Sequence, residues 1–273
     1  MINVLYAVLV LGVLGAVFGA VLAFAAKKFA VEVDERQEKI VEVLPGANCG
    51  GCGYAGCSGY AAAVVNDGAP VNRCAAGGSA VAAKVAEIMG VEAGETERRV
   101  AMVRCSGFTG KAQKKFDYSG IPDCVAAMRL GGGAGPNECP HGCIGLGTCV
   151  KACPFDAIHV ENGVARVDHE KCVGCMTCAA ACPKGLIIAV PYDANITVAC
   201  NSVQKGAVLR KYCDIGCIGC KMCEKVCEND AIHVVDNLAR IDYTKCISCG
   251  KCAEKCPRGL IVDSHLNSEF DAC

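Results

Sequence analysis

Cysteine is the residue type that dominates the chemistry available to this chain. The 273 residues include 25 cysteines, about nine per cent, a content at which cysteines organise the fold. Most of them fall in tight groups of four, with two to five residues between neighbours. Such spacing does not by itself forbid disulfides, which would require an oxidising compartment. Repeated CxxCxxC is nonetheless the arrangement expected of thiolates that converge on one inorganic cube.

The second half of the chain contains an internal repeat with an offset of 74 residues. The text AIHVENGVARVDHEKC aligns with AIHVVDNLARIDYTKC, and each copy predicts two short strands around a tight turn, Asn162-Gly163 or Asp236-Asn237. GLIIAV and GLIVDS predict one further strand in each copy. Two copies of one small α+β module explain the repeat. The aligned cysteines are Cys143, Cys149, Cys153, Cys172, Cys175, Cys178 and Cys182 with Cys217, Cys223, Cys227, Cys246, Cys249, Cys252 and Cys256.

The second copy resembles the bacterial two-cluster ferredoxin over the whole module. Two CxxCxxCxxxC runs follow one another, and the resemblance implies that the fourth cysteine of each run ligates the other cluster. Glu228 replaces the usual proline after the first run, which removes no ligand. The implied ligand sets are Cys217, Cys220, Cys223 and Cys256 for one cube, and Cys246, Cys249, Cys252 and Cys227 for the other.

The first copy departs from this pattern at one ligand. Leu146 stands where the second copy has Cys220, and an extra Cys139 appears upstream. Because a cube needs four thiolates, we expect Cys139 to supply the missing one. Four-Cys zinc sites are the alternative, but they pair two CxxC knuckles and do not usually interlock such runs. The predicted sets are Cys139, Cys143, Cys149 and Cys182, with Cys172, Cys175, Cys178 and Cys153 for the partner cube.

A separate four-thiolate group lies in a glycine-rich loop nearer the N-terminus. It comprises Cys49, Cys52, Cys57 and Cys74. The intervening glycines let the backbone wrap a cluster and direct N–H groups at its sulfurs. A phosphate-binding loop is the alternative, but no Gly-Lys-Ser/Thr follows the loop.

Five cysteines remain outside these motifs. Cys105 and Cys124 precede the first repeat copy, and Cys200 and Cys213 follow it. These four could converge as a sixth cluster held between segments 101–125 and 198–214, and free thiols or a zinc site are the alternatives. Cys273 is terminal and is expected to have no role.

Residues 4–26 form an uncharged and mostly apolar run. A helix of roughly 20 apolar residues is long enough to span a bilayer. A cleaved signal peptide would need a basic n-region and a shorter apolar stretch, and no Lys or Arg precedes Lys27. Lys27 and Lys28 then predict that the bulk of the chain faces the cytoplasm. That compartment is reducing, which favours metal thiolates over disulfides.

The predicted fold class is α+β, with helical patterns at 31–44 and 79–89 between the apolar run and the repeat. The predicted divisions are a transmembrane helix and anchor at 1–28, a juxtamembrane helix or stalk at 29–45, a four-Cys [4Fe-4S] domain at 46–100, a connecting segment with Cys105 and Cys124 at 101–135, a first ferredoxin module at 136–192, a connector with Cys200 at 193–207, a second ferredoxin module at 208–265 and a tail at 266–273.

The order of these parts resembles the B subunit of the Rnf-type ion-translocating ferredoxin:NAD oxidoreductase. The resemblance is carried by LPGANCGGCGYAGC at 44–57 and by CxxxCxGxGxCxxxCP at 139–154. It covers nearly the whole chain, with the second ferredoxin module as an extension that some members would lack. It implies a single-pass subunit of the cytoplasmic membrane, with its soluble domains on the cytoplasmic side. Such a subunit accepts electrons from soluble ferredoxin and passes them through [4Fe-4S] clusters to membrane subunits that pump Na⁺ or H⁺ and reduce NAD⁺.

Other function classes find less support in the sequence. The net charge of −1 gives no global field for nucleic acid, and no GxGxxG follows a strand. The five histidines are scattered and no nucleophile–base set appears, so we expect no bond-making chemistry. A polyferredoxin subunit of another membrane-bound hydrogenase or dehydrogenase is the main alternative. A redox-sensing regulator is disfavoured, because a sensor rarely needs five or six clusters.

Charge is uneven between the two ferredoxin modules. Residues 138–193 hold four Lys/Arg and six Asp/Glu, whereas residues 205–258 hold ten and seven. An acidic ferredoxin would be steered toward the positive module. The sequence therefore predicts a docking site near Lys221, Lys225, Lys251 and Lys255, and ordinary surface scatter is the alternative.

Overall fold

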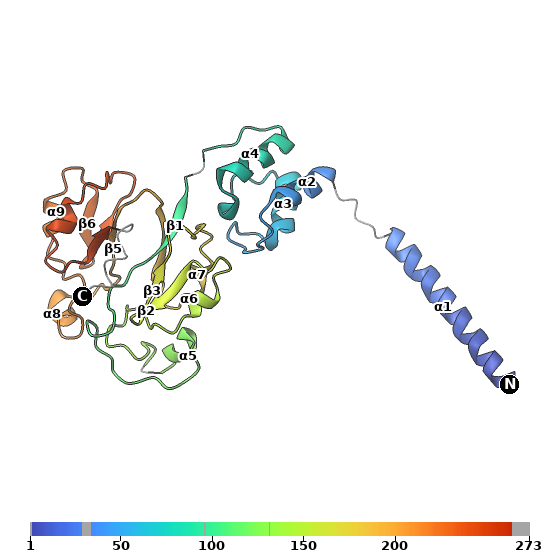
Figure 1. Cartoon of the computed structure of the whole chain (residues 1–273), viewed down its shortest axis with the longest axis horizontal. Helices are drawn as coiled ribbons and strands as arrows, with labels where there is room; N and C mark the ends of the chain where they lie inside the picture. Colours follow the sequence, from blue (N-terminus) through green and yellow to red (C-terminus); the bar gives the residue numbers. More distant parts are fainter. Residues whose placement is uncertain (1, 29–33, 96, 131, 264–273) are drawn as a thin grey trace.

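The structure is a computed structural model that describes residues 2–28, 34–95, 97–130 and 132–263. A long N-terminal helix, a small helical domain and a larger body of short strands and helices follow one another along the chain (Figure 1). Cys273 lies outside the described residues.

The N-terminal apolar run lies in one helix, α1 (Ile2–Lys28), which ends at Lys27 and Lys28. Its large apolar side chains from Leu9 to Phe24 are exposed wherever they are described. Judged on the residues that the structure describes, none of its helices meets the length and hydropathy required to cross a membrane. The structure therefore does not support the transmembrane helix expected at 4–26.

The helical domain contains α2 (Glu35–Val43), α3 (Gly56–Asn66), the 3₁₀ turn η1 (Ala75–Gly77) and α4 (Gly78–Met89). α4 confirms the helical pattern predicted at 79–89, and α2 confirms the described part of the pattern predicted at 31–44, of which residues 31–33 lie outside the described residues. The core of the domain is formed by Ile40, Tyr60, Val64 and Val85. The Tyr60 hydroxyl donates to the Pro70 carbonyl at 2.7 Å, which ties the loop before Cys74 to α3.

The two repeat copies fold in the same way, as the sequence predicts. The first hairpin pairs β2 (Ile158–Glu161) with β3 (Val164–Val167), and the second pairs β6 (Ile232–Val235) with β7 (Leu238–Ile241). Both turns have two residues with positive φ, 47° and 81° at Asn162-Gly163 and 49° and 63° at Asp236-Asn237. This is the geometry of a type I′ hairpin.

Each copy contains a second antiparallel pair, one strand of which the sequence did not reveal. The predicted strands are β4 (Ile187–Pro191) and β8 (Ile261–Asp263). β4 pairs with β1 (Arg99–Val103), and β8 pairs with β5 (Ile196–Val198). The repeat unit therefore extends further upstream than the cysteine motifs indicate. The short helices are α5 (Cys124–Met128), α6 (Thr148–Lys151), α7 (Thr177–Ala181), α8 (Gly206–Leu209), α9 (Met222–Lys225) and α10 (Lys251–Glu254).

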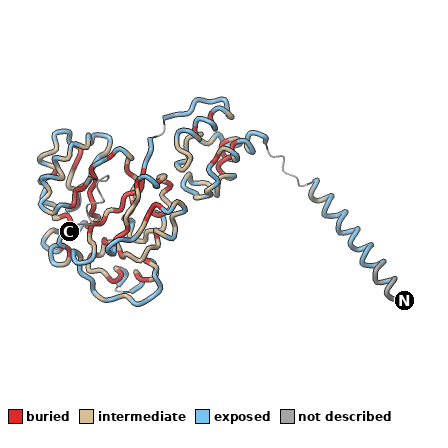
Figure 2. The backbone as a smooth tube through the Cα atoms, in the orientation of Figure 1, coloured by how far each residue is buried: buried red, intermediate tan, exposed pale blue. Residues whose placement is uncertain are grey.

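The buried residues of the large body follow these strands (Figure 2). Ile158 and Leu186 in the first copy correspond to Ile232 and Leu260 in the second, and all four are at most 2% exposed. Cysteines complete both cores. Every cysteine in the described part of the chain is a free thiol.

Candidate metal centres

The glycine-rich loop brings all four of its predicted cysteines to one cavity of about 380 Å³, which Cys49, Cys52, Cys57 and Cys74 line together. The loop turns at Gly50, Gly53 and Gly56, each with positive φ. Asn48 Oδ1 accepts a hydrogen bond from the Cys57 N–H at 2.8 Å. Burial raises the pKa of Cys49 and of Cys74. A bound metal cluster would offset that cost, because metals bind the thiolate form.

The first cavity of the first ferredoxin module differs from the prediction at one cysteine. A space of about 400 Å³ is lined by Cys143, Cys149, Cys182 and Cys124, and Cys139 lines a different cavity. Burial raises the pKa of Cys149 to about 12, and the thiols of Cys143, Cys124 and Cys182 add to the effect. The structure therefore does not bring Cys139 to the cavity of these cysteines, and Cys124 lies there instead.

The segment that carries Cys124 explains the difference. Asp123 caps α5 by accepting from the Ala126 N–H at 2.8 Å. Thr148, at the start of α6, accepts from the Cys124 N–H at 2.7 Å and donates to Asp123 at 3.0 Å. These bonds hold Cys124 against the loop in which Leu146 replaces the cysteine of the second copy. Leu146 itself packs on the small core of Cys124, Ala127 and Ile144.

The structure brings the second predicted group of the first module together. Burial raises the pKa of Cys178 to about 12, and the neighbouring thiols of Cys172, Cys175 and Cys153 raise it further. The backbone N–H of Ala101, on β1, donates to Cys172 Sγ at 3.3 Å. β1 thus supplies one of the N–H···S contacts that commonly surround iron–sulfur clusters.

In the second module the structure also brings the predicted cysteines together. Cys227, Cys246, Cys249 and Cys252 line a cavity of about 370 Å³. Burial raises the pKa of Cys223 to about 11, with further contributions from the thiols of Cys217, Cys256 and Cys220. Cys220 and Cys249 are exposed, whereas the other cysteines of this module are buried or half-buried.

A further cavity of about 410 Å³ lies between the two modules. Its lining includes Cys105, Cys139, Cys200 and Cys213, with Cys143 at one wall. Of the expected group Cys105, Cys124, Cys200 and Cys213, the structure brings three to this cavity, together with Cys139, whereas Cys124 lines the cavity of the first module. A signal was available in the sequence, because Cys139 and Cys213 are separated by the repeat offset of 74 residues.

The donor sets have the residue type that iron–sulfur clusters require. Within the described ranges, no group of three or more His, Cys, Asp or Glu side chains lies close enough to bind one metal ion. A [4Fe-4S] cube is larger than an ion, and thiols arranged around a cavity are the donors that it requires. The residues present therefore fit cubane clusters.

The helical domain contacts the first module beside one of these groups. Thr177 Oγ1 donates to the Cys49 carbonyl at 3.2 Å. A Cβ at Gly51 would lie 2.5 Å from the Cys175 carbonyl oxygen, so only a glycine permits this approach. Cys175 also lines the cavity of the helical domain. Two candidate centres thus adjoin across this contact.

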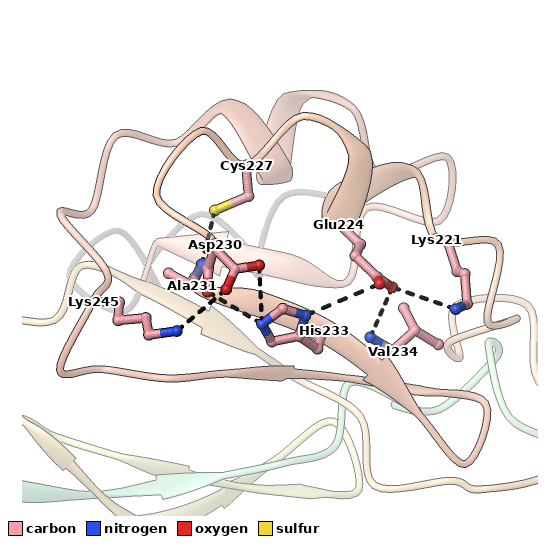
Figure 3. A network of polar contacts seen from close by, with 8 residues as sticks. All are labelled: Lys221, Glu224, Cys227, Asp230, Ala231, His233, Val234 and Lys245. Carbon is pink, nitrogen blue, oxygen red and sulfur yellow. Dashed lines mark hydrogen bonds and ion pairs between the residues drawn. The ribbon is translucent and has the colours of Figure 1, made fainter.

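The predicted docking lysines lie on a surface with several ion pairs. Lys221 faces Glu224 at 3.8 Å, and Glu224 also contacts His233 and the Val234 N–H (Figure 3). Lys251 pairs with Glu228 at 2.6 Å, and this contact lowers the pKa of the Glu228 carboxyl. Lys225 and Lys255 are exposed. The charge of Lys221 and Lys251 is therefore partly offset.

Family models match the three motif regions. Residues 44–76 match the model described as "Putative Fe-S cluster". Residues 141–186 and 216–261 each match a "4Fe-4S dicluster domain". Together with the cysteine-lined cavities, these matches define a multi-cluster [4Fe-4S] protein of the ferredoxin type.

Relatives extend the likeness over most of the chain. The B subunit of the proton-translocating ferredoxin:NAD(+) oxidoreductase complex of Clostridium ljungdahlii is 48% identical, over 95% of this chain and 92% of the relative. The B subunit of the Na(+)-translocating complex of Acetobacterium woodii is 46% identical, over 92% and 75%. The B subunit of an ion-translocating oxidoreductase complex of Methanosarcina acetivorans is 41% identical, over 92% and 95%. The chain belongs to the family of B subunits of ion-translocating ferredoxin:NAD(+) oxidoreductase complexes.

Proposed function

We propose that this chain accepts single electrons from reduced soluble ferredoxin and relays them through [4Fe-4S] clusters to the membrane subunits of an ion-translocating ferredoxin:NAD(+) oxidoreductase. The observation that carries the proposal is the set of cysteine-lined cavities in a chain 48% identical to such a subunit over 95% of its length. All-thiolate cubes exchange electrons without making or breaking substrate bonds, at potentials that the surrounding protein adjusts.

Five clusters follow from the motif regions, with one ligand changed from the sequence prediction. Cys124 takes the place of Cys139 in the first module, because it lines the cavity with the other three thiols. The proposed sets are Cys49, Cys52, Cys57 and Cys74; Cys124, Cys143, Cys149 and Cys182; Cys153, Cys172, Cys175 and Cys178; Cys217, Cys220, Cys223 and Cys256; and Cys227, Cys246, Cys249 and Cys252.

The internal repeat supports a direction for the electron path. In the first module the loop of Cys175 is covered by the helical domain, at Gly51 and Cys49. The equivalent residue of the second module is Cys249, which is exposed. Ile247, beside it, is 69% exposed. In the first module this surface binds the helical domain of the same chain. In the second module the equivalent surface is open, and a separate cluster protein could bind there.

We therefore place the ferredoxin docking site around Ile247 and Cys249, flanked by Lys225, Lys251 and Lys255. The net positive charge of this module favours an acidic donor. Electrons would then pass from the second module to the first, and from Cys175 toward the helical domain. The helical domain is the part of the described body that lies next to the N-terminal helix in sequence.

Attachment to the cytoplasmic membrane, with the cluster domains on its cytoplasmic side, is also part of the proposal. It is supported by the apolar run at 4–26, by Lys27 and Lys28 after it, and by the ion translocation that the relatives' names describe. Carbonate extraction of membranes would test it. Retention of the full chain in the pellet is expected, and its release from the pellet would contradict the anchor.

Stopped-flow reduction of the anaerobically purified full chain by ferredoxin tests the donor site. Replacing Lys225 and Lys255 with Glu should lower the second-order rate and flatten its dependence on salt. Lys84→Glu, an exposed lysine on α4 of the helical domain, is the matched control and should leave the rate unchanged. If the Lys225 and Lys255 replacements lowered the rate no more than Lys84→Glu does, or did not lower it at all, the donor would dock elsewhere.

A further inference from the structure

We infer that the cavity between the two ferredoxin modules holds a sixth [4Fe-4S] cluster, ligated by Cys105, Cys139, Cys200 and Cys213. All four residues lie outside the segments 44–76, 141–186 and 216–261 that the family models match. The inference adds one cluster to the electron path of the proposed function. It depends on that proposal only for the identity of the cofactor, a [4Fe-4S] cluster.

The four thiols come together from four separate segments of the chain. They line one cavity of about 410 Å³. The Sγ atoms of Cys105 and Cys213 lie 3.6 Å and 4.0 Å from the point where a Cβ at Gly107 would stand. The pKa of Cys139 is raised by burial and by the Cys213 thiol, and the pKa of Cys200 is raised by burial, with the Cys139 thiol as a smaller cause. Cys139 is thus a direct electrostatic neighbour of thiols from the other module.

Each module contributes the same two positions to this site. Cys139 and Cys213 are related by the repeat offset. Cys105 follows β1 and Cys200 follows β5, the strands that pair with the equivalent β4 and β8. The residue before each cysteine makes the same bond: the Arg104 N–H donates to the Leu186 carbonyl and the Ala199 N–H to that of Leu260, both at 2.9 Å. Each module thus supplies one half of a single four-thiolate site.

Backbone donors surround the sulfurs and connect the site to both modules. Cys105 Sγ accepts from the N–H groups of Gly107 and Cys143 at 3.4 Å each. In the second module, Cys200 Sγ accepts from the Cys217 N–H at 3.4 Å. Cys143 and Cys217 are equivalent in the repeat, and each is a proposed ligand of the first cube of its own module. The sixth cluster would therefore lie between two others and connect the modules electronically.

An unpartnered polar side chain in the cavity wall also points to a bound group. Ser106 is 2% exposed and lines the cavity, and its hydroxyl has no hydrogen-bond partner among the described residues. Arg104 lines the same cavity, and its Nε also has no hydrogen-bond partner among the described residues. Buried donors of this kind are costly unless they are paired. The sulfur atoms of a cluster in the cavity would supply acceptors.

The test is iron and sulfide analysis of the full chain, purified anaerobically. Six cubes correspond to about 24 iron atoms, and five to about 20. Cys200→Ala and Cys213→Ala should each remove about four iron atoms, and the double variant should remove no more than either alone. Cys124→Ala combined with Cys213→Ala should remove about eight, because two clusters are affected. Cys273→Ala is the matched control and should remove none.

Each other outcome has a distinct meaning. About 20 iron atoms in the parent chain, unchanged by Cys200→Ala, would overturn the sixth cluster and leave the proposed function intact. About 20 iron atoms and one zinc that disappears in Cys200→Ala would assign the cavity to zinc instead. Little iron of any kind would overturn the proposed function itself. Should the variants fail to fold, thiol alkylation of the native parent chain decides, since rapid labelling of two or more of the four cysteines contradicts the cluster.

Discussion

Gly51 offers a way to separate the helical domain from the first ferredoxin module without replacing any proposed ligand. Replacing Gly51 with Ala puts a Cβ 2.5 Å from the Cys175 carbonyl oxygen and 2.9 Å from its Cα, whereas ordinary contact begins at 3.4 Å. The two backbones must therefore move apart by roughly 0.9 Å, the difference between 3.4 and 2.5 Å. Because the φ of Gly51 is not in the left-handed region, the loop itself accepts Ala without strain.

The same displacement would break the contact beside it. The Thr177 Oγ1 to Cys49 carbonyl bond is 3.2 Å long, and an added 0.9 Å exceeds hydrogen-bond range. Loss of such a bond costs about 1 kcal/mol, which shifts the ratio of docked to undocked domains about fivefold. We expect the iron content to stay at the parent value while electron transfer into the helical domain slows.

The assay is EPR of the reduced chain combined with intramolecular electron-transfer kinetics. Magnetic coupling between the cluster of the helical domain and the cluster of Cys175 should weaken in Gly51→Ala, and the last kinetic phase should slow. Gly59→Ala is the matched control, because a Cβ there meets only ordinary contacts at 3.9 and 4.0 Å. Unchanged coupling and unchanged kinetics in Gly51→Ala would refute the contact as the route between the two clusters.

Three further predictions concern the ligands and their surroundings. Cys124→Ala should remove about four iron atoms, and adding Leu146→Cys should restore them by recreating the second copy's ligand; iron analysis would count against the reassigned ligand if Cys124→Ala lost none. Cys139→Ala should also remove about four iron atoms, and its EPR spectrum should change in the same way as that of Cys200→Ala. An EPR change that matched Cys124→Ala instead would show that Cys139 is a ligand in the first module. Ser106→Ala should lower the midpoint potential of one cluster in a redox titration, because a hydrogen bond to cluster sulfur raises the potential, and an unmoved potential would mean that the hydroxyl does not reach the cluster.

Local pattern was sufficient for much of this protein. The hairpin turns at Asn162-Gly163 and Asp236-Asn237, the strands after the last cysteine of each run and the helix at 79–89 all follow from residue type over a few positions. The same holds for Cys49, Cys52 and Cys57 and for Cys246, Cys249 and Cys252, since cysteines with two to four residues between neighbours lie in one loop. In these segments the residues that determine the local structure are close together in the sequence, so the structure can be predicted without knowledge of the tertiary packing.

Tertiary structure decided which distant cysteines share a cavity. Cys124 and Cys139 are both candidates to replace Leu146 by counting, and Cys139 is nearer in sequence. The capping of α5 by Asp123 and Thr148 brings Cys124 into the first module instead, and this leaves Cys139 for the cavity between the modules. Strands β1 and β5 were missed for the same reason, because each is only three to five residues long and is defined by its partner. Contacts between segments far apart in the chain depend on loop closure and packing, and neither of these produces a recognisable pattern in the sequence.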